Sequence, residues 1–278
     1  MSEKSKLYED GAKPKLLSRQ FSFTEGPVPD KEGNVYFTDQ PNNEIWKYSV
    51  DGALSLFTNN SFRANGMYID NHGNIVACAD QLGQLVSFDP TAEPQVLLDN
   101  VKGLRMNGPN DLWIDASNGI YFTDPYYERN YWPEPKPVKH KESVYYLPPG
   151  KKEAIVVADD LVKPNGIIGT PDGKELYVAD IGDDKIFKYK IGADGLLQDK
   201  TLFTDMGSDG MTLDEQGNVY LTGKGVTIFN KEGKRIDHLP IDEDWTANIC
   251  FGGRDHQFLF ITASKGIYGM QMMVRGMR

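Results

Sequence analysis

Short runs in which hydrophobic and polar residues alternate recur along the whole chain, and a turn containing glycine precedes many of them. Two of the clearest runs are residues 35–39 (VYFTD) and 219–222 (VYLT). Aromatic and β-branched residues dominate these runs, as they do in β-strands, and Gly-Asn or Asp-Gly pairs are typical of the turns between strands. The pattern predicts an all-β protein.

The runs are organised in repeats of similar length. The turn glycines are spaced by 40, 46, 54 and 44 residues, and they are Gly33, Gly73, Gly119, Gly173 and Gly217. Repeats of about 40–50 residues with several short strands each are typical of β-propeller blades. A β-sandwich would explain the strands, but not the register that holds over five or six copies. We therefore expect a six-bladed β-propeller.

The ends of the chain predict how the ring closes. The sixth repeat, from residue 248 onward, ends near residue 273 without a fourth strand, and residues 15–19 (KLLSR) resemble the missing one. An N-terminal strand that pairs with the last blade would leave no long free edge. We expect a single domain over residues 1–278, with residues 1–14 flexible or loosely packed.

One oxygen-bearing residue returns at the same place in every repeat, 11 or 12 positions before one residue of the predicted second strand. Counted back from Tyr36, Val76, Tyr121, Tyr177, Tyr220 and Phe260, these residues are Glu25, Asn65, Asn110, Asn165, Asp209 and Asn248. Innermost strands line the channel of a propeller, so we expect these side chains, which we call the ring residues, to meet at one mouth. Oxygen ligands without sulfur or imidazole favour Ca²⁺, with Mg²⁺, Mn²⁺ or Zn²⁺ as alternatives. Asn65 and Asn248 are expected to hydrate the channel or to satisfy backbone groups.

An insertion over residues 125–142 interrupts the third repeat and is rich in proline and aromatic residues. Tyr126, Tyr127 and Trp132 could stack on a substrate ring, or they could pack the loop itself. The sequence leaves two alternatives open, a lid over the channel mouth and a surface loop packed on a neighbouring blade.

Composition limits the partners. The net charge of −10 disfavours nucleic acid and anionic membranes, and no run approaches the ~20 apolar residues of a membrane span. Residues 1–15 lack an apolar stretch, so we expect no signal peptide, and Cys78 and Cys250 read as buried thiols in a reducing, cytoplasmic setting. The oligomeric state stays open.

Five short motifs carry a family resemblance: residues 23–27 (FTEGP), 105–111 (RMNGPND), 122–125 (FTDP), 163–166 (KPNG) and 208–211 (SDGM). In this order they resemble the gluconolactonase, senescence-marker-protein-30 and luciferin-regenerating-enzyme family, over nearly the whole chain. The resemblance implies a six-bladed propeller with one divalent ion in the channel and hydrolysis of a lactone ester bond.

The resemblance also implies roles for individual residues. Glu25, Asn165 and Asp209 look like metal ligands, and Asn110 looks like a ligand or a substrate contact beside the metal. Arg105 lies where some members carry a substrate-binding arginine, although the intervening sequence is longer here. With Asn110, Asp124, Tyr126, Tyr127 and Trp132, it completes the expected substrate-binding set.

The function predicted is metal-dependent hydrolysis of a small sugar lactone, in which the cation polarises the carbonyl and activates water. Asp209 is the expected general base, with Asp124 and Asp111 as alternatives that could equally bind backbone amides. No Gly-x-Ser-x-Gly motif is present, and all four histidines are interpreted as structural or solvent-exposed. Alternatives are a hydrolase of another small ester, phosphotriester or aromatic lactone, and a non-enzymatic calcium-stabilised binding propeller.

Overall fold

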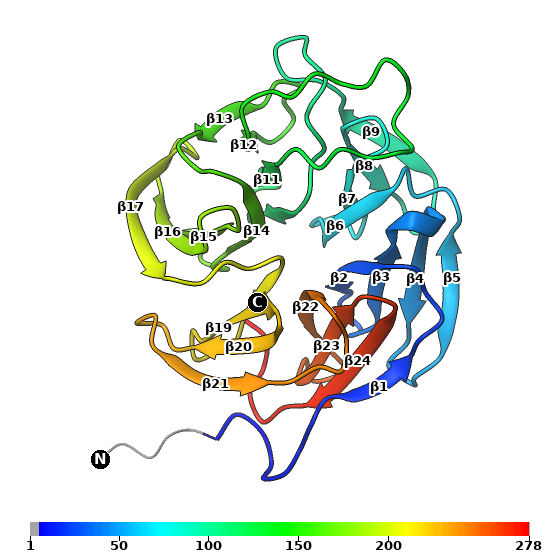
Figure 1. Cartoon of the computed structure of the whole chain (residues 1–278), viewed down its shortest axis with the longest axis vertical. Helices are drawn as coiled ribbons and strands as arrows, with labels where there is room; N and C mark the ends of the chain where they lie inside the picture. The colour runs from blue at the N-terminus through cyan, green and yellow to red at the C-terminus, as the bar shows by residue number, and fades with distance from the viewer. Residues whose placement is uncertain (1–5, 278) are drawn as a thin grey trace.

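Each predicted repeat forms one four-stranded antiparallel sheet, and six such sheets surround a central channel (Figure 1). The computed structural model describes residues 6–277. Nearly all regular structure is strand, and the one short 3-10 helix is η1 (Gln40–Asn42). The predicted all-β six-bladed propeller is confirmed.

The strands of a blade follow one another from the channel outward. The innermost strands contact each other around the channel and are β2 (Thr24–Pro29), β6 (Ala64–Ile69), β10 (Leu112–Ile114), β14 (Pro164–Gly169), β18 (Met211–Leu213) and β22 (Thr246–Gly252). The second strands are β3 (Val35–Asp39), β7 (Ile75–Ala79), β11 (Ile120–Asp124), β15 (Glu175–Asp180), β19 (Val219–Gly223) and β23 (Phe258–Ala263).

The outer half of each blade completes the sheet. The third strands are β4 (Glu44–Tyr48), β8 (Gln84–Phe88), β12 (Ser143–Leu147), β16 (Lys185–Ile191), β20 (Gly225–Phe229) and β24 (Gly266–Gln271). The outermost strands are β5 (Leu54–Thr58), β9 (Pro94–Leu98), β13 (Ile155–Ala158), β17 (Leu197–Thr204), β21 (Arg235–Leu239) and β1 (Lys15–Ser18).

The ring closes as the sequence predicts. β1 pairs antiparallel with β24, with Lys15 opposite Gly269 and Leu16 opposite Tyr268. Within residues 6–14, part of the segment expected to be flexible or loosely packed, Leu7 is buried between the fifth and sixth blades and Tyr8 Oη donates to Asp237 at 2.5 Å, while most of the other residues are exposed. Residues 1–5 of that expectation lie outside the described chain.

The hydrophobic core is divided into six clusters, each lying between two neighbouring blades. Buried threonines of the second strands add polar links at the channel: Thr38 Oγ1 donates to the carbonyl of Asn65, and Thr123 Oγ1 to that of Asn165 at 2.7 Å. Each link joins one blade to the inner strand of the next. The core therefore fixes where the channel-lining strands begin.

Cys78 and Cys250 are free and buried, as expected. No helix within residues 6–277 is long and apolar enough to span a membrane. The Asp-x-x-Gly-Asn segments form ordinary turns, in which Asp30 and Asp214 accept hydrogen bonds from the backbone N–H four residues later.

Candidate functional site

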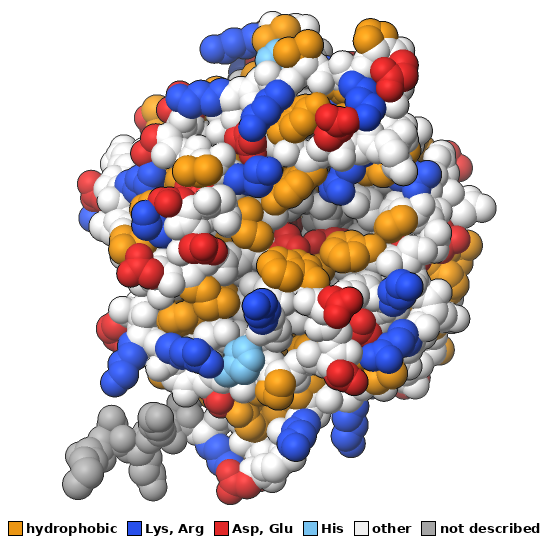
Figure 2. Space-filling model, viewed as in Figure 1, with side chains coloured by type: hydrophobic (Ala, Val, Ile, Leu, Met, Phe, Trp, Pro, Cys, Tyr) orange, Lys and Arg blue, Asp and Glu red, His pale blue; other side chains and the backbone are white. Residues whose placement is uncertain are grey.

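Five of the six ring residues meet in one cavity of about 520 Å³, at the end of the channel where the inner strands begin. The cavity, which we call the mouth cavity, is lined by Phe23, Glu25, Gln40, Pro41, Asn65, Asn110, Tyr127, Arg129, Asn165, Ile181, Asp209 and Trp245. Figure 2 shows acidic side chains at the bottom of a hollow near the centre of the face, edged by hydrophobic groups. Residues far apart in the sequence thus form one polar site.

Asn248 does not line the mouth cavity, because the count that selected it is shifted by one residue in the sixth blade. The count starts from one residue of the second strand, which pairs with a residue of the inner strand. The other ring residues lie three positions before that inner-strand partner. In the second blade, for example, Val76 pairs with Tyr68, and Asn65 lies three positions before Tyr68. In the sixth blade Phe260 pairs with Cys250, so the equivalent ring position is Ala247. A shift of one residue along a strand turns the side chain to the other face.

The residue after each ring position determines how closely the inner strands approach. This residue is glycine in four blades, and a β-carbon on Gly166 would lie 2.3 Å from the carbonyl oxygen of Asp209. These glycines make room for the next blade. In the other two blades Asp111 and Asn248 fill the space, each accepting a hydrogen bond from the following backbone N–H.

Two buried carboxylates give the mouth cavity its charge. Burial, together with the negative charge of Asp209, raises the pKa of Glu25 well above its usual range. Burial also raises the pKa of Asp209 to about 6, against hydrogen bonds from Trp245 and Asn165 and the positive charge of Arg129, which lower it. Two carboxylates held this way stabilise any cation placed between them.

The amide oxygens of the ring fit a cation as well. The Oδ1 atoms of Asn65 and Asn165 are buried and accept no hydrogen bond from any group of residues 6–277, although buried polar atoms normally have a partner. Asn165 Nδ2 donates to Tyr127 Oη at 3.0 Å, so the side chain is held on one side and its oxygen is left over. No three His, Cys, Asp or Glu side chains cluster in the described chain, so a cation would rest on two carboxylates and amide oxygens. Such oxygen sets suit a hard divalent ion.

Sequence comparison agrees with this geometry. The family model for the SMP-30/gluconolactonase/LRE-like region matches residues 23–265. The chain belongs to this family. A gluconolactonase of Zymomonas mobilis is 30% identical to it, over 91% of this chain and 79% of the relative. The family predicted from the sequence motifs is confirmed.

Solved structures of relatives share the propeller of this SMP-30/gluconolactonase/LRE-like chain. A gluconolactonase of Xanthomonas campestris superposes with a TM-score of 0.87 at 26% identity, covering 95% of this chain and 90% of its own. A calcium-binding regucalcin of Agrobacterium tumefaciens has a TM-score of 0.80 at 19% identity, with 95% of each chain covered. The second likeness shows the fold alone.

The insertion of this family member reaches the mouth cavity with only part of its aromatic set. Tyr127 and Arg129 line the cavity, while Trp132 is buried against the second blade, where its Nε1 donates to Asp80 at 2.9 Å. Tyr126 packs edge-on against Trp132. The insertion therefore combines the two alternatives left open by the sequence, because it packs on a neighbouring blade and also borders the mouth.

Two further residues of the expected substrate-binding set lie outside the mouth cavity. The Arg105 guanidinium lies 4.8 Å from the Trp132 ring and donates to the carbonyl of Met106, so it holds the insertion. Asp124 accepts hydrogen bonds from the backbone N–H groups of Asn107 and Gly108 at 2.9 and 2.8 Å. Asp124 thus has the strand-end role that was its alternative interpretation, although burial raises its pKa to about 7.

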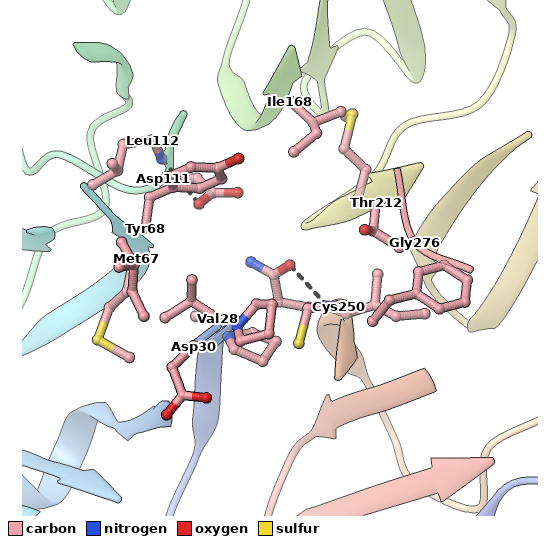
Figure 3. A pocket seen from close by; sticks show the side chains of 18 of the residues that line it. Val28, Asp30, Met67, Tyr68, Asp111, Leu112, Ile168, Thr212, Cys250 and Gly276 are labelled. Atoms are coloured by element: carbon pink, nitrogen blue, oxygen red, sulfur yellow. Dashed lines mark hydrogen bonds between the residues drawn. The ribbon is translucent and has the colours of Figure 1, made fainter. Parts of the chain in front are cut away.

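A second cavity, of about 330 Å³, lies at the other end of the channel, and we call it the far cavity. Figure 3 shows Met67 and Tyr68 on one side of it, Ile168 and Thr212 across from them, and Cys250 between. Asp111 lines this cavity rather than the mouth, and burial raises its pKa to about 7. Asp111 therefore lines a different cavity from Asp209, although its negative charge still contributes to the raised pKa of Glu25.

Sequence reasoning missed six of the residues that line the mouth cavity, and two of these, Trp245 and Arg129, act directly on its carboxylates or present free donors to it. Trp245 donates from Nε1 to Asp209 Oδ2 at 2.6 Å. It lies two residues before Ala247, as Phe23 lies two residues before Glu25, so the correct register in the sixth blade would have indicated it. Arg129 lies inside the irregular insertion, where no periodic signal could place it.

Proposed function

We propose that the protein is a metal-dependent lactonase, which hydrolyses the ester bond of a small sugar lactone in the mouth cavity. One observation carries the proposal: two buried carboxylates and unpaired amide oxygens converge in a ligand-sized cavity of a chain from the gluconolactonase family. Concave sites with a few convergent polar groups and raised carboxyl pKa values are typical of enzymes.

Glu25, Asn165 and Asp209 would hold the cation, with Asn110 and Asn65 beside it. Their oxygen donors favour Ca²⁺, with Mg²⁺, Mn²⁺ and Zn²⁺ as alternatives. When bound, such an ion supplies Lewis-acid polarisation of the lactone carbonyl and a more acidic water. The chain's own contribution is to hold these oxygens in place before substrate arrives.

Asp209 is the proposed general base. Trp245 engages its Oδ2 at 2.6 Å, which leaves Oδ1 for the cation or for the proton of the attacking water. Without a cation, burial raises the pKa of Asp209 to about 6, and a cation bound beside it would lower that pKa, so the ionised, proton-accepting form prevails at neutral pH. Asn165 is fixed from two sides, by Tyr127 at the side chain and by Thr123 at the backbone.

A second candidate is an aromatic lactone or another small ester. Tyr127 and Trp245 place two aromatic side chains on the mouth cavity, and these could pack against an aryl group as well as a sugar ring. The two buried free cysteines support a cytoplasmic location, which is likewise a proposal.

The test is an assay of chelator-treated protein on glucono-1,5-lactone, corrected for spontaneous hydrolysis. Ca²⁺, Mg²⁺, Mn²⁺ and Zn²⁺ are returned one at a time. We expect one ion to restore turnover, and we expect Asp209→Asn to abolish it. Turnover of aryl esters or aromatic lactones alone would select the second candidate. A folded, cation-stabilised protein without turnover of any ester would select the non-enzymatic propeller.

A further inference from the structure

Aspartates at the ends of the second strands have a recurring structural use, and one aspartate departs from it. Three of them accept hydrogen bonds from the two backbone N–H groups that lie three and two residues before their own blade's ring position: Asp39, Asp124 and Asp180. In the second blade Ala79 occupies this register, and the aspartate follows one residue later as Asp80. Asp80 is therefore not used by its own blade in this way.

Asp80 binds the insertion instead. Its side chain is 4% exposed, and its carboxylate accepts hydrogen bonds from Arg129 Nε at 2.7 Å, Tyr131 Oη at 2.8 Å and Trp132 Nε1 at 2.9 Å. All three donors come from the insertion of the third blade. Charge-assisted bonds to a buried carboxylate are stronger than neutral ones, so this group fixes the insertion beside the mouth.

Arg129 faces the mouth cavity, and some of its N–H groups are available to a ligand. Its Nε is held by Asp80, its guanidinium lies 5.6 Å from the centre of the Tyr127 ring, and it lines the cavity. Within residues 6–277, no protein atom accepts a hydrogen bond from its two terminal amino groups. A guanidinium fixed at one nitrogen presents the others at a defined angle to a ligand.

We propose that Arg129 is a specificity-determining residue, which donates hydrogen bonds to the hydroxyl oxygens of a neutral, polyhydroxylated lactone. Asp80 is its positioning residue. The assignment rests on the proposed lactonase function and names the substrate class that the mouth cavity selects.

The charges around Arg129 favour a neutral ligand over an anionic one. The Asp80 carboxylate, 2.7 Å away, already compensates the guanidinium charge. Glu25 and Asp209 line the same cavity, and the proposed divalent cation would offset their two charges, so a substituent carboxylate or phosphate would lose its hydration beside Arg129 with no net positive charge to compensate it. Hydroxyl oxygens can accept the free N–H groups without this cost.

Steady-state kinetics test the role of Arg129. We expect Arg129→Met to raise the KM for glucono-1,5-lactone by roughly 10- to 100-fold, because a hydrogen bond from a charged donor is lost. Arg129→Lys keeps the positive charge but not the paired guanidinium N–H groups, so its KM is expected to lie between those of wild type and Arg129→Met. The matched control is Lys136→Met, which removes a cation from an exposed pair with Glu128 in the same insertion and should leave KM within twofold.

A double-mutant cycle tests the role of Asp80. If Asp80 acts through Arg129, Asp80→Asn should raise KM in wild type but add little to Arg129→Met, since both changes remove one interaction. Thermal unfolding of the four proteins gives the structural effect separately. KM effects that simply add would overturn the positioning role.

Binding provides a readout independent of turnover. Calorimetry with the non-hydrolysable glucono-1,5-lactam should show tight binding to wild type and roughly 10-fold or more weaker binding to Arg129→Met. The wild-type kcat/KM should be lower for 6-phosphoglucono-1,5-lactone than for glucono-1,5-lactone.

The outcomes separate the two proposals. Wild-type inactivity on every lactone would remove the proposed function, and the assignment of Arg129 with it. Wild-type turnover combined with an unchanged KM and unchanged lactam affinity in Arg129→Met would remove the assignment alone. Preference for the phosphorylated lactone would overturn the neutral substrate class.

Discussion

The two ends of the channel are made by the same six inner strands, yet they present different chemistry. The mouth cavity holds Glu25, Asp209 and unpaired asparagine oxygens, whereas the far cavity is lined largely by side chains such as Met67, Ile168 and Cys250. The inter-blade clusters need apolar residues along the strands, but they leave the residue at the start of each strand free. Polar side chains therefore gather where the strands begin. Substitutions at either end of the channel can test this difference.

The largest contrast is expected between Asp209→Asn at the mouth and Thr212→Val in the far cavity. Asp209→Asn removes a proposed cation ligand that is also the proposed base, and we expect a loss of kcat of roughly 1,000-fold. Thr212→Val, three residues along the same blade, should change kcat less than twofold. The measurement is kcat on glucono-1,5-lactone with the preferred ion. Comparable losses in both variants would mean that the whole channel is needed, not its mouth.

A second contrast concerns the packing of the two ends. In Gly166→Ala the new β-carbon would lie 2.3 Å from the backbone oxygen of Asp209, so the inner strands must move apart and we expect a loss of about 3 kcal/mol in the free energy of unfolding. Gly173 lies in the turn after β14, and an added β-carbon there meets nothing within 4 Å. Gly173→Ala should cost roughly 1 kcal/mol for its positive φ alone. Urea denaturation measures both.

The third contrast is in the pH dependence of the chelator-treated protein. Asp209 and Asp111 have folded pKa values of about 6 and about 7, above the 3.8 of an ordinary aspartate. The folded state keeps its protons where the unfolded state has lost them, so the free energy of unfolding must fall as pH rises from about 4 to 7. For Asp209 alone, the raised pKa corresponds to a loss on the order of 3 kcal/mol in the free energy of unfolding over this pH range.

A bound cation should cancel the part of this loss that arises at the mouth. We expect Ca²⁺ to raise the Tm strongly at pH 7.5 and little at pH 4.5. Asp111→Asn should reduce the pH dependence while the response to Ca²⁺ stays the same. If Asp111→Asn abolished that response, the ion would bind toward the far end.

The smallest expected effect is that of Trp245→Phe. The aromatic ring stays, but Asp209 Oδ2 loses its hydrogen bond. Because that bond lowers the pKa of Asp209 in the wild type, its loss should raise the pKa. We expect a fall in kcat of roughly 10-fold and a shift of the acidic limb of the pH–rate profile to higher pH. A profile that moves to lower pH would contradict the assignment of Asp209 as base.

The sequence predicted the ring well because the repeat is regular. Counting back from the second strand located Glu25, Asn65, Asn110, Asn165 and Asp209, all of which line the mouth cavity. Asn248 does not line that cavity, because the sixth blade departs from the spacing by one residue and a single residue reverses the face of a strand, but its Oδ1 accepts a backbone N–H, which is a role expected of it. Asn65 was expected only to hydrate the channel or to satisfy backbone groups, and its unpaired oxygen in the mouth cavity was not foreseen. Sequence spacing carries no information on hydrogen-bond partners.

The insertion was predicted less well, for a physical reason. Its conformation is set by side-chain contacts with another blade, above all those of Asp80, and not by a periodic backbone pattern. For Trp132 the sequence left stacking on a substrate and packing of the loop as alternatives, and its buried ring, which packs against Arg105, has the second role. Composition identified an aromatic, proline-rich insertion, but only the fold could show that Tyr127 and Arg129 are the residues that reach the cavity.

The pairing of β1 with β24 has a consequence for the order of events during synthesis. The segment 15–18 is translated well before its partner 266–271, so the sixth blade cannot form until residue 271 has been made. During that time five blades can pair internally while the circle stays open, with β1 exposed as an unpaired strand. The chain therefore becomes a closed ring in one late step, and its two ends are held in a single sheet from that moment on.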